Sequence, residues 1–166
     1  GSSTCGARLA AHLGLPYAFA SHFAPGDLMR ALQVYRDDFK PSARLAEPYV
    51  MLGYNVIAAE TDAAATHLFT SLLQAFINAR SGRPGKLPSP VEGYGSRLSP
   101  SEQAMVDQTL VHTAVGAPAT VRAKLAAFVD ATGANELMIT SQIWDHDARR
   151  RSLALLAEAW GMPASA

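Results

Sequence analysis

The chain has few charges, one cysteine and no long apolar run. Only 17% of its 166 residues are charged, and 14 Lys and Arg balance 14 Asp and Glu, so the formal net charge is zero. The longest basic cluster is Arg149, Arg150 and Arg151, which argues against a nucleic-acid partner, because phosphates need many neutralising cations. No apolar run approaches the roughly 20 residues that span a bilayer, so we expect no membrane partner.

The cysteine and histidine residues argue against an internal disulfide and against a metal site. The single Cys5 cannot form an internal disulfide, which fits a reducing cytoplasm. His112 and His146 follow no spacing that is typical of a metal site, so no metal is expected. The chain begins GSSTCGARLA, without an initiator methionine. This opening GSS is open to three interpretations: a cloning remnant, an ordinary turn, or part of a binding loop.

Apolar spacing and turn signals predict helices that alternate with strands. Strands are predicted within three apolar stretches, which are residues 15–23, 47–60 and 135–143. Helices are predicted at 3–13, 27–39, 61–80, 99–110, 117–132 and 145–160, and a Gly/Pro-rich connection at 81–98. This order indicates parallel βαβ units in one α/β piece over residues 1–166.

Three strands are few for so many helices, and a three-stranded parallel sheet would leave both of its edges open. The first helix also lacks the strand that should precede it. On these grounds we expect the chain to be the C-terminal part of a larger α/β protein.

Four stretches resemble the C-terminal half of bacterial-luciferase-like flavin-dependent monooxygenases, in their single-domain group. They are GSS…GARLAA.LGLPYAFASHF.P (1–25), EPYVMLGYNVIAAET (47–61), VGAPATVRAKLAAF (115–128) and NELMITSQIWDHDARRRSLALLAE (135–158). The resemblance covers essentially the whole chain. It implies a (β/α)8 TIM barrel of which this chain holds strands six to eight, helices five to eight and an insertion before strand eight. The N-terminal half would be absent.

The resemblance gives the opening GSS a role. In this family the loop after strand five and the following helix start hold the flavin phosphate, which implies Ser2, Ser3, Thr4 and the Gly6 amide as cofactor-binding groups. Small residues let backbone N–H groups approach an anion, and a helix N-terminus favours negative charge. The alternative is that Ser and Thr here only cap the helix.

The segment ASHF follows a predicted strand, at the end where TIM barrels place their active sites. The resemblance implies that Ala20 and Ser21 face the isoalloxazine ring and that His22 lies nearby. No catalytic residue can be assigned. His22 is the one candidate, a structural role is its alternative, and no partner carboxylate is identifiable.

Polar residues interrupt strands that are otherwise apolar. Tyr54, Asn55 and Gln142 could contact the flavin or satisfy one another in a network, and Gly53 would allow close packing or close ligand approach. Four of the five methionines are expected in the core; they are Met29, Met51, Met105 and Met138.

The resemblance implies a protein that uses reduced FMN and O2 to oxygenate a small organic substrate. A flavin reductase or NAD(P)H would supply electrons, and we expect a homo-oligomer. One alternative is an F420-dependent oxidoreductase of the same superfamily. The other is a truncated fragment that self-associates and is catalytically inert; the fragment alone is expected to be inactive. A Schiff-base aldolase is disfavoured because Lys40, Lys86 and Lys124 lie in predicted loops or helices.

Overall fold

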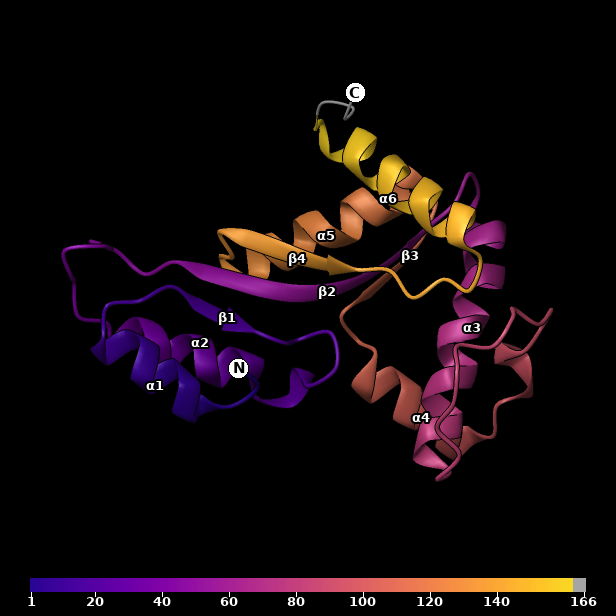
Figure 1. Cartoon of the computed structure of the whole chain (residues 1–166), viewed down its shortest axis with the longest axis horizontal. Helices are drawn as coiled ribbons and strands as arrows, with labels where there is room; N and C mark the ends of the chain where they lie inside the picture. Colours follow the sequence, from indigo (N-terminus) through magenta and orange to yellow (C-terminus); the bar gives the residue numbers. More distant parts are fainter. Residues whose placement is uncertain (163–166) are drawn as a thin grey trace.

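The computed structural model describes residues 1–162 and contains a four-stranded sheet in which every pairing is parallel (Figure 1). The strands are β1 (Tyr17–Phe19), β2 (Val50–Ala58), β3 (Thr113–Gly116) and β4 (Glu136–Thr140). The α/β class and the parallel sheet are confirmed, whereas the expected number of strands was wrong. The missed strand, β3, has only four residues, and unlike β1 it does not lie within a longer apolar stretch.

Strand β2 pairs with each of the other three strands. The Tyr17 N–H donates to Tyr49 O, and the Asn55 N–H donates to the residue before β3, so β1 and β3 pair one after the other with the same edge of β2. The Asn135 N–H donates to Val50 O, which places β4 on the opposite edge. The long β2 therefore organises the whole sheet.

The predicted helices all form, with small differences at their ends. They are α1 (Thr4–His12), α2 (Leu28–Asp37), α3 (Asp62–Arg80), α4 (Pro100–Thr109), α5 (Pro118–Thr132) and α6 (His146–Trp160). Thr61 accepts from Ala64 N and caps α3, and Ser99 and Glu102 form the expected capping box of α4. Asp27 stands at the N-cap of α2, but its side chain makes no cap hydrogen bond, because the preceding turn is a 3-10 helix (Pro25–Asp27) that enters α2 directly.

Helices α1, α2, α5 and α6 pack against one face of the sheet and form the main core. Even-numbered residues of β2 point into this core, because side chains alternate along a strand; they are Val50, Leu52, Tyr54, Val56 and Ala58. Helices α3 and α4 project away from the sheet (Figure 1) and share a smaller core of Leu73, Ile77 and Val106. The long connection 81–98 is fastened to α3, since Val91 N donates to Thr70 Oγ1.

Within residues 1–162, the other face of the sheet has no helix layer of its own. Met138 on β4 is 53% exposed and Met51 on β2 is half-buried. Met29, on the outer side of α2, is 57% exposed. The prediction of a core position was therefore wrong for Met29 and Met138, because an apolar residue on an uncovered face has the same sequence signal as a core residue. Parallel sheets are normally covered on both faces, so this face is the natural place to search for a site.

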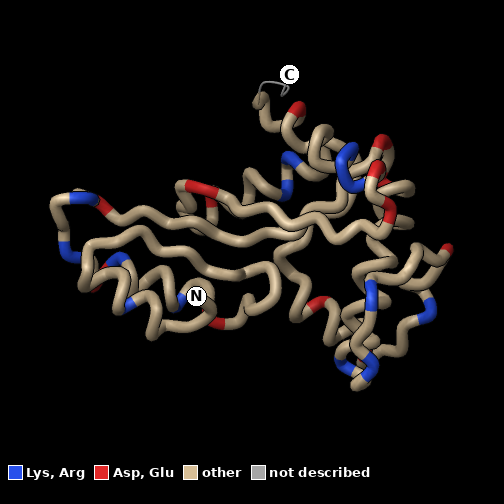
Figure 2. Tube along the Cα trace, in the orientation of Figure 1, with Lys and Arg blue, Asp and Glu red and all other residues tan. Residues whose placement is uncertain are grey.

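Charged residues lie on helices, in loops and at the start of β4, and both signs are interspersed (Figure 2). Strands β1, β2 and β3 carry none. The uncovered face of the sheet is therefore nearly neutral.

No described helix is long and apolar enough to cross a membrane.

Candidate functional site

The uncovered face of β1 and β2 forms the floor of a cavity of about 250 Å³. Small residues dominate this floor, and Met51 and Met138 lie beside them; the small residues are Gly1, Ala18, Ala20 and Gly53. Because the floor residues lack bulky side chains and charges, a flat apolar ring can approach the backbone closely. This surface is called the small-residue floor below.

His22 lies at the end of this floor, in the loop after β1. Its Nδ1 is buried and has no hydrogen-bond partner among the described residues. Burial lowers the pKa of the imidazole and favours its neutral form. A Cβ on Gly53 would lie 2.0 Å from His22 Nδ1, so only glycine at position 53 leaves room for the ring. The predicted close approach at Gly53 is therefore an approach by His22.

Asn55 fixes the backbone around His22. Its side chain is almost fully buried (1% exposed), and its Nδ2 donates to His22 O at 2.9 Å and to Thr113 Oγ1 at 3.2 Å. Its Oδ1 accepts from Thr140 Oγ1 at 2.5 Å. One amide thus joins the loop after β1 to β3 and β4, which supports the network alternative for Asn55. Tyr54 points the other way, into the core, where its ring centroid lies 4.7 Å from that of Phe128.

Ser21 is fully buried, and its Oγ donates to Gly53 O at 2.6 Å. This bond fills the interval on the edge of β2 where β1 has ended and β3 has not begun. Ala20 lines the small-residue floor. That Ala20 and Ser21 contact a flavin ring remains a prediction.

The opening GSS lies directly beside the floor. The Gly1 nitrogen donates to Ala18 O at 2.6 Å, and Ala20 N donates to Gly1 O at 2.8 Å. A residue of a neighbouring parallel strand makes these two bonds. Gly1 is thus fixed against β1, and the chain passes from the floor straight into the start of α1.

Ser3 stands at the N-cap of α1, but its hydroxyl makes no cap hydrogen bond, so the capping alternative is wrong for Ser3. Its carbonyl instead accepts from Tyr17 Oη at 3.1 Å. The N–H groups of a first helical turn have no partner within the helix, and here Ser2 and Ser3 are exposed around them while Thr4 and Gly6 are half-buried. These residues fit an anion such as a flavin phosphate. That they bind one remains a prediction.

A second cavity, of about 330 Å³, lies on the other side of His22. Its wall comes from the loop after β1, the second half of α3, the end of α4 and Gln142. Sequence reasoning found His22, Asn55 and Gln142 but missed Phe76 and Arg80, because nothing in the spacing of α3 separates them from other surface residues.

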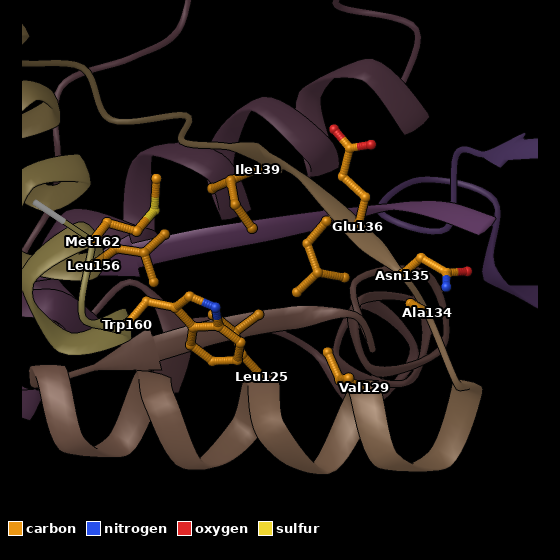
Figure 3. Close-up of a pocket in the computed structure, with 10 residues that line it drawn as sticks. Leu125, Val129, Ala134, Asn135, Glu136, Ile139, Leu156, Trp160 and Met162 are labelled. Atoms are coloured by element: carbon orange, nitrogen blue, oxygen red, sulfur yellow. The ribbon is translucent and has the colours of Figure 1, made fainter. Parts of the chain in front are cut away.

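A third cavity, of about 220 Å³, lies between α5, α6 and β4. Figure 3 shows the side chains of Leu125, Ile139 and Trp160 converging on it, while the Glu136 carboxylate points away. None of its lining residues borders either cavity beside His22. Within residues 1–162 no group of three or more His, Cys, Asp or Glu could hold a metal ion.

Comparison with known proteins gives consistent matches. The family model for luciferase-like monooxygenases matches residues 1–136. A luciferase-like monooxygenase of Escherichia coli K12 is 50% identical over 155 residues, which are 93% of this chain and 46% of the relative. An uncharacterized protein of Bacillus subtilis, YvbT, is 47% identical over 160 residues, 96% of this chain and 48% of that protein. The chain thus spans about half the length of these relatives.

Solved structures agree on the fold. Apo-MsnO8 has a TM-score of 0.82 and 32% identity, over 99% of this chain and 50% of that one. The oxygenating constituent of 3,6-diketocamphane monooxygenase from Pseudomonas putida, in complex with FMN, has a TM-score of 0.59 and 21% identity over 96% of this chain and 46% of that one.

Proposed function

Because the chain belongs to the luciferase-like monooxygenase family, we propose that it forms part of an enzyme that uses reduced FMN and O2 to oxygenate a small organic substrate. One observation carries this proposal: the small-residue floor runs through Gly1 into the uncapped start of α1. A planar ring and a phosphate need these two surfaces next to each other. The FMN bound in a neighbour of the same fold supports this choice of flavin.

Each residue at the site has a part in this proposal. Ser2, Ser3 and Thr4 donate hydroxyl hydrogen bonds to the phosphate, and the Gly6 N–H adds a backbone donor. Ala20 and the neighbouring floor lie under the isoalloxazine ring. FMN, when bound in its reduced form, supplies the electrons for the reaction with O2.

His22 and Ser21 complete the ring pocket in different ways. The His22 imidazole lies at the edge of the ring, with its Nδ1 packed over Gly53, and closes that end of the floor. Ser21 contributes by holding Gly53 O, which keeps the floor flat. Substrate, O2 and an electron source, either a flavin reductase or NAD(P)H, are the partners that the reaction requires.

The experiment is a titration of FMN with the chain, followed by quenching of flavin fluorescence. We expect saturable binding that Ser3→Glu weakens about tenfold or more, because the added carboxylate repels the phosphate. Ser101→Glu adds the same charge near the start of α4 and should leave the affinity unchanged. If a folded chain fails to bind FMN, or binds it equally well with Ser3→Glu, the proposal is wrong.

Two further measurements on the same purified protein test the two alternative functions. Tighter binding of F420 than of FMN would favour a deazaflavin-dependent oxidoreductase on the same fold. A self-associating, inert fragment would instead bury its uncovered sheet face against a second copy. Sedimentation of the wild-type chain and of Met138→Glu then separates the cases, since the added charge should dissociate such an oligomer.

A further inference from the structure

Two cavities meet at a single side chain. Of the residues that line the cavity over the small-residue floor and those that line the second cavity, only His22 belongs to both sets. Asn55 holds the His22 carbonyl in place, and Gly53 leaves the space that the imidazole occupies. His22 therefore forms a fixed wall between two spaces that separate molecules can fill.

The second cavity is apolar over most of its wall. Helix α3 contributes Leu72, Ala75 and Phe76, the C-cap of α4 is Leu110, and the loop after β1 contributes Phe23. Burial of apolar ligand surface against such side chains is favourable at roughly 25 cal/mol per Å². The lining therefore suits an alkyl chain or an aromatic ring better than a sugar or a nucleotide.

One charge distinguishes this cavity from the floor. Among the described lining residues, Arg80 is the one Lys, Arg, Asp or Glu. The Arg80 guanidinium lies 5.3 Å from the centroid of the Phe76 ring, and it makes no ion pair with another described residue. A guanidinium over an aromatic face keeps its N–H donors free for an anion.

We propose that the second cavity binds the organic substrate and that this substrate is a largely apolar molecule with one anionic group, which Arg80 binds. The assignment rests on the proposed function, which puts the flavin ring on the floor. The apolar body of the substrate then lies against Phe76 and Leu110, and its inner end reaches the His22 wall. Gln142 offers an uncharged hydrogen bond at the same end of the sheet.

The test uses three probes of equal chain length, octanoate, octan-1-ol and octylamine, each titrated by calorimetry below its micelle concentration. We expect octanoate to bind at least about tenfold more tightly than octylamine. Arg80→Gln should weaken octanoate about tenfold and leave octan-1-ol unchanged. Arg83→Gln, which removes an exposed cation just beyond α3, is the matched control and should change neither affinity.

Two measurements locate the binding and separate it from the flavin. Octanoate should shift the NMR resonances of His22 and Leu110, and it should still bind when FMN is present, because the cavities share only one side chain. Equal binding of octanoate and octylamine, equal effects of Arg80→Gln and Arg83→Gln, or competition with FMN would each overturn the inference. If FMN binds and octanoate does not, the inference fails and the proposed function stands. Failure of FMN to bind overturns the proposed function, whatever octanoate does.

Discussion

The contact between Gly53 and His22 predicts that Gly53→Ala destabilises the wild-type chain but stabilises a chain that lacks the His22 ring. Gly53 has an ordinary strand conformation, not one of the positive φ values found at six other glycines, so its backbone accepts alanine. At such a position Gly→Ala stabilises a protein by about 0.4–1 kcal/mol, through the unfolded chain. The new Cβ, however, would lie 2.0 Å from His22 Nδ1 and 2.8 Å from His22 Cε1.

The imidazole must therefore move, and its surroundings make this costly. Asn55 holds the His22 carbonyl at 2.9 Å, and the Phe23 ring packs edge-on at a centroid distance of 5.2 Å. Overpacking of this kind costs about 1–3 kcal/mol. We expect Gly53→Ala to destabilise the wild-type chain by about 1–2 kcal/mol, after the backbone gain is subtracted. In the His22→Ala background the same change should stabilise by about 0.5 kcal/mol.

The assay is urea unfolding of the four proteins of this double-mutant cycle, with the free energy of unfolding taken from the linear extrapolation. The expected coupling between positions 53 and 22 is about 2 kcal/mol. Effects that add within about 0.5 kcal/mol would refute the reasoning, because they would mean that the imidazole does not occupy the space over Gly53.

Three further predictions concern single groups. Ser152→Ala removes the buried hydroxyl that accepts from Ala58 N at 2.8 Å, so we expect urea unfolding to show a loss of about 1–3 kcal/mol; a loss below 0.5 kcal/mol would contradict it. The hydrogen bond from Ala117 N holds the pKa of Asp62 below its ordinary value. The Asp62 carboxylate therefore contributes fully to stability above the unfolded pKa of about 4, and this contribution is lost as the pH falls through the folded pKa. Between pH 6 and pH 3 the free energy of unfolding should fall by more for the wild type than for Asp62→Asn. Burial raises the pKa of Tyr17 to about 12. The contribution of the buried hydroxyl to stability is therefore full below the unfolded pKa of about 10 and is lost as the pH rises toward 12. In an ultraviolet titration, Tyr17→Phe should remove one tyrosine that ionises at higher pH than the others.

Much of the fold could be predicted because its signals are local. The apolar run that became β2 is continuous in the sequence, and Thr61 and Ser99 stand at the helix starts that their side chains cap. The family resemblance identified the opening residues and the ASHF segment, which the structure brings to one end of the sheet. Neither signal required knowledge of a distant contact.

The parts that were missed depend on distant contacts. Asn55 is fixed by Thr113 and Thr140, which lie 58 and 85 residues away in the chain, so its role as a junction could not be chosen over flavin contact. Arg80 borders a cavity only because α3 projects beside the loop after β1. Ser3 could cap α1 by its position, but its backbone carries the interaction instead.

The central place of β2 also affects the order in which the chain can fold as it is synthesised. Strand β1 meets β2 through residues 17–19 and 50–52, so this pair can form once residue 52 has left the ribosome. The opposite edge of β2 pairs with residues 136–140, which emerge long after β2 itself. That edge must stay unpaired until these residues have been made, and closing so long a loop is slow. The neutral, apolar β2 is then exposed to other chains, which makes it the segment that a chaperone would most need to cover.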